Sequence, residues 1–180
     1  DSYNNKCFYE NESGTDERFK MRIRIYNCSL DDIKLEIKYK KNGYSSKESC
    51  LIDEKLFKKL ISGKKIEYKE CDNKVLRKLY IEQNTSILMP KIMVEYDRIA
   101  YVDNIGNTRI TFDTNIRATN HLDRILESNI YARPILEKNK HILEIKYDEI
   151  LPNYVSKEFE MINLEHTSFS KYYLSRLAFK

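Results

Sequence analysis

Apolar and polar residues alternate along several stretches of the chain, with the period of two that is typical of a β-strand. The clearest stretch is FKMRIRIY at residues 19–26. Met21, Ile23 and Ile25 fall on one face, and the other face carries Lys20, Arg22 and Arg24. At a rise of about 3.3 Å per residue, neighbouring charges on that face lie about 7 Å apart. The pattern predicts a strand with one apolar and one cationic face.

The same alternation predicts two hairpins and a further strand. KLEIKYK at residues 34–40 is followed by Asn42-Gly43, a strong turn signal, and then by YSSKESCLI at 44–52. KIMVEYDRIAYV at 91–102 and NTRITFD at 107–113 flank DNIG and predict the second hairpin. HILEIKYD at 141–148 predicts the further strand, and its pattern repeats that of LEIKYK at 35–40.

Helical spacing of apolar residues appears between these strands. DEKLFKKLISG predicts a helix with Asp53 as its cap and Gly63 as its stop, and a last helix is expected to begin near Ser168 or Ser170. The other candidates are DNKVLRKLYIEQ at 72–83, HLDRILES at 121–128 and NYVSKEFEMINL at 153–164. No linker rich in Pro, Gly or Ser divides the chain, so we expect one α+β domain over residues 1–180 with an antiparallel sheet.

Cations are concentrated on the polar faces of the predicted strands. The acids on those faces are few, namely Glu36, Asp113 and Glu144. A solvated sheet with mixed charges is the simplest alternative, because exposed ion pairs contribute only about 0–1 kcal/mol each. The cations on predicted strands are Lys20, Arg22, Arg24, Lys38, Lys40, Lys47, Arg98, Arg109 and Lys146.

A sheet with one cationic face that closes into a barrel would have a basic lumen covered outside by helices. Two cations about 7 Å apart repel by roughly 2 kcal/mol at an effective dielectric near 20, so such a lumen favours a polyanion. Arg binds phosphate in two-point fashion, and Mg²⁺ or Mn²⁺ is held by one or two carboxylates plus phosphate oxygens. Glu36 and Glu144 are the candidate metal ligands, with salt bridges to neighbouring cations as the alternative.

Composition narrows the class of protein. The net charge of +4 is modest and gives no reason to expect nucleic-acid binding, and no apolar run predicts a membrane span in this chain. Four cysteines without metal-binding spacing favour free thiols in a reducing cytoplasm over two disulfides. The three histidines show no ligand spacing and are interpreted as incidental.

In these segments the chain resembles the VTC domain, the catalytic module of polyphosphate polymerases within the triphosphate tunnel metalloenzymes. The matching segments are FKMRIRIY, LEIKYK with the following Lys47, EYDRIAY, TRITFD, ILEIKYDEILP and FSKYY. They occur in the family's order and span nearly the whole chain.

The resemblance implies an antiparallel barrel tunnel with flanking helices, in which the terminal phosphoryl group of ATP passes to a growing polyphosphate with the help of Mn²⁺ or Mg²⁺. The implied metal carboxylate is Glu144, with Glu36 as a second candidate, and Lys20 is expected to matter least. The implied catalytic residues are Arg22, Arg24, Lys38, Arg98 and Arg109, and the phosphate-binding residues are Lys40, Lys47, Lys146 and Lys171.

The chain also departs from the family pattern. Members usually have an earlier basic strand, and DSYNN lies inside what resembles a motif of the next strand, so we expect an N-terminally incomplete tunnel. A triphosphate or polyphosphate hydrolase and a non-catalytic polyphosphate sensor are therefore kept as alternatives. The expected partners are ATP and polyphosphate, with no nucleic acid and no membrane contact by this domain, although a membrane-linked parent protein is compatible with the pattern.

Overall fold

The computed structural model describes residues 1–160 and 164–180. The chain divides into two compact units. Unit 1 comprises Asp1–Met93, Thr119–Tyr131 and Phe179, and unit 2 comprises Val94–Ala118, Ala132–Ala178 and Lys180. The single domain expected over residues 1–180 stays a prediction.

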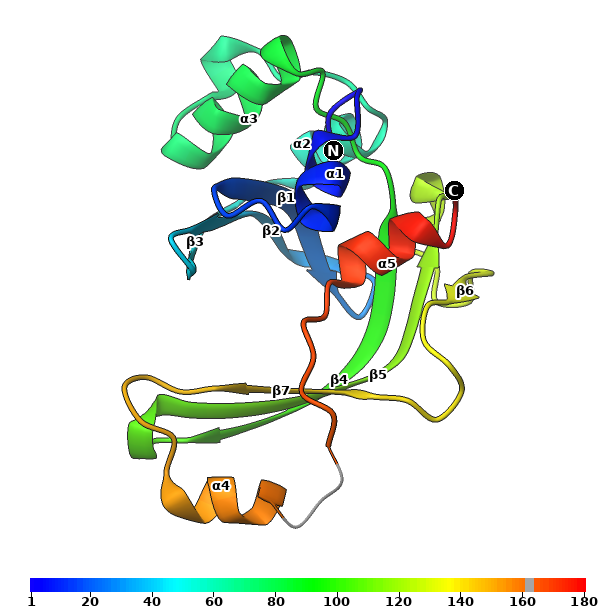
Figure 1. Ribbon diagram of the computed structural model, residues 1–180. Helices are drawn as coiled ribbons and strands as arrows, with labels where there is room; N and C mark the ends of the chain where they lie inside the picture. The colour runs from blue at the N-terminus through cyan, green and yellow to red at the C-terminus, as the bar shows by residue number, and fades with distance from the viewer. Residues whose placement is uncertain (161–163) are drawn as a thin grey trace. The chain divides into compact units, whose positions relative to one another are not determined.

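Unit 1 contains the first predicted hairpin in a three-stranded antiparallel sheet (Figure 1). Its strands are β1 (Arg18–Tyr26), β2 (Ser29–Lys41) and β3 (Tyr44–Leu51), in the order β1-β2-β3. Asn42 and Gly43 join β2 to β3 with φ of 52° and 78°. Two consecutive positive φ angles are required by a type I′ turn, which suits the twist of paired strands. The turn signal in the sequence is thus confirmed.

Two helices cover the apolar face of this sheet, α2 (Glu54–Ile61) and α3 (Lys74–Thr85), with a 3-10 turn η1 (Tyr68–Glu70) between them. The predicted cap of α2 is confirmed, because the Asp53 carboxylate accepts a hydrogen bond from the Leu56 amide at 2.7 Å. Asn73 caps α3 in the same way. The buried core contains Ile33, Leu35 and Ile37 of β2 with Phe57, Leu60, Val75, Leu76 and Leu79 of the helices.

Two parts of unit 1 differ from the sequence-based prediction. The strand expected at DSYNN, residues 1–5, does not form, and helix α1 (Lys6–Glu12) follows these residues. The Asp1 carboxylate accepts hydrogen bonds from the amides of Cys7 and Phe8 at 2.8 and 3.2 Å, and both of these side chains are buried. Asp1 therefore stabilises the beginning of α1.

The helix predicted over residues 121–128 is wrong. The structure has a 3-10 turn there, η3 (Leu122–Arg124). A helix this short depends on the packing of its apolar face, and of residues 121–128 only Ile125 is among those packed against the core of unit 1.

Unit 2 is built around the second predicted hairpin, β4 (Met93–Asp103) and β5 (Thr108–Thr119), joined by η2 (Ile105–Asn107). Strand β5 pairs with β4 and also, antiparallel, with β6 (Arg133–Pro134) and β7 (Ile142–Lys146). In the β5–β7 register, Arg109 lies opposite Lys146 and Thr111 lies opposite Glu144.

Two helices complete unit 2, α4 (Asn153–Glu160) and α5 (Lys171–Leu177). The helix predicted over residues 153–164 is confirmed for its first part, and residues 161–163 lie outside the described residues. The Ser170 hydroxyl accepts a hydrogen bond from the Tyr173 amide at 3.3 Å, so Ser170 caps α5 as the sequence predicts.

Together these elements confirm an α+β fold with antiparallel sheets. No closed barrel is found within residues 1–160 and 164–180, so the tunnel stays a prediction. Helices cover the apolar face of the sheet in unit 1, whereas in unit 2 several apolar side chains of β4 are open to solvent. Ile99, Tyr101 and Val102 are 58%, 60% and 69% exposed.

All four cysteines are free thiols, as the sequence predicts. No helix of the described residues has the length and apolar character that crossing a membrane requires.

Candidate functional site

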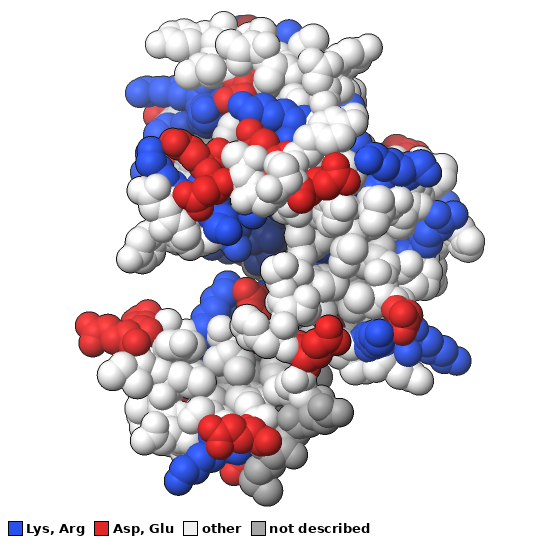
Figure 2. Space-filling view, viewed as in Figure 1, with Lys and Arg blue, Asp and Glu red and all other residues white. Residues whose placement is uncertain are grey.

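A row of lysines crosses the polar face of the sheet in unit 1. Lys20 of β1 lies opposite Lys38 of β2, and Lys38 lies opposite Lys47 of β3. We call these three residues the lysine row. Neighbouring strands are about 4.8 Å apart, and like charges directly opposite each other destabilise a sheet. The row therefore concentrates positive charge at a cost in stability. Figure 2 shows Lys and Arg side chains gathered around this sheet, with acidic side chains among them.

One carboxylate offsets part of this charge. Glu36 lies directly beside the row on β2, opposite Arg22 of β1, and its side chain is only 2% exposed. Its oxygens lie 2.5 Å from Arg22 Nε, 3.4 Å from Lys47 Nζ and 4.0 Å from Arg24 Nε. We call these four residues the Glu36 cluster. Its three cations and one carboxylate leave a formal charge of +2.

The cations of this cluster also decide the protonation state of the carboxylate. Burial by itself raises the pKa of Glu36, but the hydrogen bond from Arg22 and the charges of Arg22, Arg24 and Lys47 outweigh it, so the pKa lies below its usual value. Glu36 is therefore ionised at neutral pH. Glu36 thus forms the salt bridges that the sequence analysis gave as the alternative to metal binding. Its role as a metal ligand stays a prediction.

A second buried carboxylate organises the cations of unit 2. Asp113 of β5 is completely buried and holds Arg98 of β4 in a two-point contact, with Nε–Oδ1 at 2.6 Å and Nη2–Oδ2 at 2.7 Å. Lys171, the first residue of α5, places its Nζ 2.6 Å from the same Oδ2. We call Asp113, Arg98 and Lys171 the Asp113 cluster. It joins the β4–β5 hairpin to α5, which lies much further along the chain.

Electrostatics keeps the Asp113 cluster charged. Burial raises the pKa of the Asp113 carboxyl. The hydrogen bonds from Arg98 and Lys171 lower this pKa by more than burial raises it, so the net shift is downward. The hydrogen bond with Asp113 in turn raises the pKa of Arg98. Two cations and one carboxylate leave a formal charge of +1 at neutral pH.

Aromatic rings support the two cations of this cluster. The ring centroid of Tyr96 lies 5.2 Å from Arg98 Cζ and 5.0 Å from Lys171 Nζ. The ring of Phe169 lies 5.7 Å from the same Nζ. Cations over aromatic faces gain about 0.5–2 kcal/mol each, depending on desolvation. The side chains of Arg98 and Lys171 thus have defined positions although both remain about one-quarter exposed, at 24% and 22%.

Glu144 is more accessible than either buried carboxylate. Its side chain on β7 is 38% exposed, with Lys146 Nζ at 3.3 Å and Arg98 Nη2 at 3.8 Å. Among the described residues, no group of three His, Cys, Asp or Glu side chains has the geometry of a metal site. A divalent cation at Glu144 would therefore take most of its ligands from substrate oxygens and water, as Mg²⁺ commonly does.

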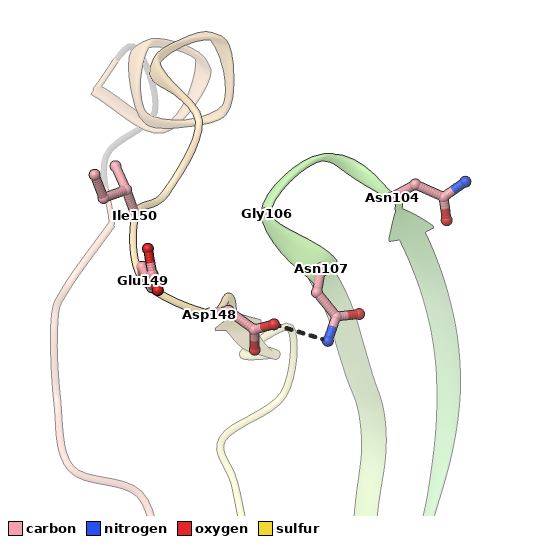
Figure 3. A pocket seen from close by; sticks show the side chains of 6 residues that line it. All are labelled: Asn104, Gly106, Asn107, Asp148, Glu149 and Ile150. Carbon is pink, nitrogen blue, oxygen red and sulfur yellow. Dashed lines mark hydrogen bonds between the residues drawn. The ribbon is translucent and has the colours of Figure 1, made fainter.

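An open pocket of about 470 Å³ lies elsewhere in unit 2. It is formed by the β4–β5 turn and the segment after β7, and Asn107 donates a hydrogen bond to Asp148 at 3.2 Å on its wall (Figure 3). None of the predicted site residues lines it. We do not assign a function to this pocket.

A protein-family comparison matches the description VTC domain over residues 1–180. The chain belongs to the VTC domain family. VTC domains are associated with polyphosphate polymerases, so the function of this VTC domain is related to polyphosphate. Comparisons with curated proteins and with solved structures gave no match.

The structure brings most of the predicted site residues of each unit together. In unit 1, Arg22, Arg24 and Lys47 surround Glu36, and Lys38 lies in the adjacent row, whereas Lys40 lies opposite Arg18 and Ser45, one row further along β2. In unit 2, the contacts connect Arg98, Lys171, Glu144 and Lys146, and the exposed Arg109 is opposite Lys146 in register.

Sequence reasoning did not select Asp113 or Tyr96 as site residues. Asp113 was visible as a rare acid in an alternating strand, and Tyr96 precedes Arg98 by two residues and so shares its face of β4. The cations that contact these two residues depend on strand pairing and on the packing of α5. The alternation of polar and apolar residues predicts neither.

Lys20 provides a test of the crowding of cations in unit 1. Desolvation, with the charges of Arg18 and Lys38, lowers the pKa of Lys20 to about 8, and its Nζ donates a hydrogen bond to Asn11. The unfolded chain, with a lysine pKa near 10.4, binds more protons than the folded chain between about pH 8 and pH 10. Its contribution to stability therefore rises with pH across this window.

We expect the free energy of unfolding of the unchanged domain to increase, relative to that of Lys20→Met, between pH 7.5 and pH 10. Chemical denaturation at both pH values measures this difference. Substitution of the exposed Lys55 by Met serves as the control and should show no such change. Parallel pH profiles for the unchanged domain and Lys20→Met would contradict the prediction.

Proposed function

We propose that this VTC domain is a metal-dependent polyphosphate polymerase, which transfers the terminal phosphoryl group of ATP to the end of a polyphosphate chain. The observation that carries the proposal is the same in both sheets. A buried carboxylate holds several cations in place but does not neutralise them all. The remaining positive charge suits a ligand with many phosphates in a row.

The chemistry of phosphoryl transfer agrees with this arrangement. The reaction depends mainly on positioning and on stabilising charge, and it needs no covalent nucleophile from the protein. Arg22, Arg24, Arg98 and Arg109 would bind phosphate oxygens through their planar guanidinium groups, which favour two-point contacts. The lysines at 38, 40, 47, 146 and 171 would add mobile point charges along the chain.

The proposal includes the tunnel with a basic lumen that the family resemblance implies. Antiparallel sheets with one cationic face support this part of the proposal. In unit 1 the helices α2 and α3 cover the opposite, apolar face, as a tunnel wall requires.

Glu144 fits a Mn²⁺ or Mg²⁺ ion better than Glu36 does. Glu144 is partly exposed, and each of its oxygens has one cation contact, at 3.3 and 3.8 Å, which leaves room for a further ligand on the solvent side. When bound, the ion would neutralise charge on the phosphate oxygens. Glu36 does not fit, since three cations surround its buried carboxylate. Its proposed contribution is to hold Arg22 and Lys47 in place.

Product analysis tests the polymerase directly. Incubation of the domain with ATP and Mn²⁺ should yield chains longer than triphosphate, detected by gel electrophoresis. Release of inorganic phosphate without polymer would instead show a hydrolase, with water as the acceptor. Binding of polyphosphate without either product would show a non-catalytic sensor.

Tripolyphosphate should raise the melting temperature of the domain. A ligand at about 100 times its Kd adds about 2.7 kcal/mol of stability. For a chain of this size this corresponds to a shift of roughly 5–10 °C. Because the attraction is electrostatic, the shift should decrease as salt increases.

Arg22→Ala and Arg109→Ala should each reduce this shift, as measured by thermal denaturation with and without the ligand. Arg124→Ala is the matched control, because Arg124 pairs with Glu127 outside the proposed site. An equal shift in all three variants would show that the polyanion does not bind at the proposed residues.

Glu144→Gln should remove the dependence of polymer synthesis on Mn²⁺ while leaving the affinity for tripolyphosphate without metal largely intact. The reason is that Gln keeps the shape of the side chain but loses the charge that a divalent ion requires. Activity across a Mn²⁺ titration and calorimetric binding measure the two effects separately. If binding falls as much as it does in Arg109→Ala, Glu144 acts by orienting Arg98 or Lys146 and not by holding a metal.

A further inference from the structure

The contacts of Asp113 use both oxygens of its carboxylate. Oδ1 accepts a hydrogen bond from Arg98 Nε, and Oδ2 contacts both Arg98 Nη2 and Lys171 Nζ within 2.7 Å. The side chain is completely buried, so solvent does not compete for these contacts. A carboxylate with both oxygens occupied by cations is poorly suited to hold a metal ion. Its role must lie in what it does to Arg98 and Lys171.

The geometry leaves part of each cation available. Guanidinium carries five N–H groups and ammonium carries three, and Asp113 takes two from Arg98 and one from Lys171. Both side chains also rest against the ring of Tyr96. Their remaining donors are thus presented from defined positions, and 24% and 22% of the two side chains are open to solvent.

Lys171 is held from a second direction. It is the first residue of α5, and the preceding Ser170 caps that helix. The ion pair between Lys171 and Asp113 connects the beginning of α5 to β5. The two-point contact between Arg98 and Asp113 connects β4 to β5. Lys and Arg side chains lose many rotamers when they are ordered, and a site that orders them before the ligand arrives avoids this loss on binding.

We infer that Asp113 is a positioning residue of the phosphate site, which sets the guanidinium of Arg98 and the ammonium of Lys171 at a fixed spacing for neighbouring phosphates. This inference rests on the proposed function and deepens it. It adds a residue that contacts no phosphate itself but determines where two cations meet the chain.

A simpler reading makes the opposite prediction. If Asp113 were only a negative charge near a polyanion site, its removal would relieve repulsion and strengthen the binding of polyphosphate. If Asp113 positions Arg98 and Lys171, its removal leaves two cations that repel each other and lose their shared anchor. Binding should then weaken although the site has become more positive. The sign of the change separates the two readings.

The test compares Asp113→Asn with Asp97→Asn in the whole domain. Asp97 precedes Arg98 on β4 and is exposed, so its substitution makes the same change in charge without touching the cluster. Tripolyphosphate is the probe, and calorimetry measures Kd at fixed salt. We expect Asp113→Asn to weaken binding by about 10- to 100-fold, the usual effect of removing a residue that orients metal ligands. Asp97→Asn should bind as the unchanged domain does.

A double-mutant cycle distinguishes positioning from a general structural role. In an Arg98→Ala background one of the two cations that Asp113 sets is already absent, so Asp113→Asn should weaken binding there much less than in the unchanged domain. Fully additive losses would overturn the inference, because they would show that Asp113 does not act through Arg98.

If Asp113→Asn does not fold, a second variant, Arg98→Lys, tests the inference instead. Arg98→Lys keeps the positive charge next to Asp113 but removes the planar fork. It should remain folded and still bind tripolyphosphate about tenfold more weakly, and normal binding would overturn the inference. Tighter or unchanged binding by a folded Asp113→Asn overturns the inference alone. Absence of tripolyphosphate binding by the unchanged domain overturns the proposed function as well.

Discussion

A buried carboxylate surrounded by cations is the interaction on which the polar faces of both sheets depend. Like charges about 7 Å apart repel by roughly 2 kcal/mol at an effective dielectric near 20, and a contact with an opposite charge at about 4 Å returns roughly 4 kcal/mol under the same conditions. One carboxylate in contact with two or three cations therefore offsets much of their mutual repulsion. Glu36 does this in unit 1 and Asp113 does it in unit 2.

Burial gives these carboxylates their effect and also carries a cost. Removing a charge from water is expensive unless partners of good geometry replace the lost hydration. Glu36 follows Leu35 and precedes Ile37, both of which belong to the core beneath α2 and α3, so the backbone around it is held firmly by packing. Asp113 instead depends on the two-point contact with Arg98 and on the ion pair from α5. The buried carboxylate is thus held in place by an apolar core in unit 1 and by polar contacts in unit 2.

Much of the local structure could be predicted from the sequence, because strands, turns and caps depend on neighbouring residues. Alternation predicted β1, β2, β4, β5 and β7, and Asn42-Gly43 predicted the first hairpin. The caps Asp53 and Ser170 were also predicted. Failures occurred where contacts outside the local pattern decide the outcome. Asp1 accepts hydrogen bonds from the beginning of α1 and does not belong to a strand, and residues 121–128 pack only Ile125 against the core of unit 1.

Alternation alone is enough to predict the cationic faces of β1 and β2, since it places every second side chain on the same side. It also determined which few acids would share those faces. The cations that each acid contacts follow from the fold, because these contacts depend on strand register and on the packing of α5. Arg22 meets Glu36 through the β1–β2 register, and Lys171 reaches Asp113 from a helix 58 positions further along the chain. Charge pattern is a local property of the chain, whereas the pairing of charges is a property of the fold.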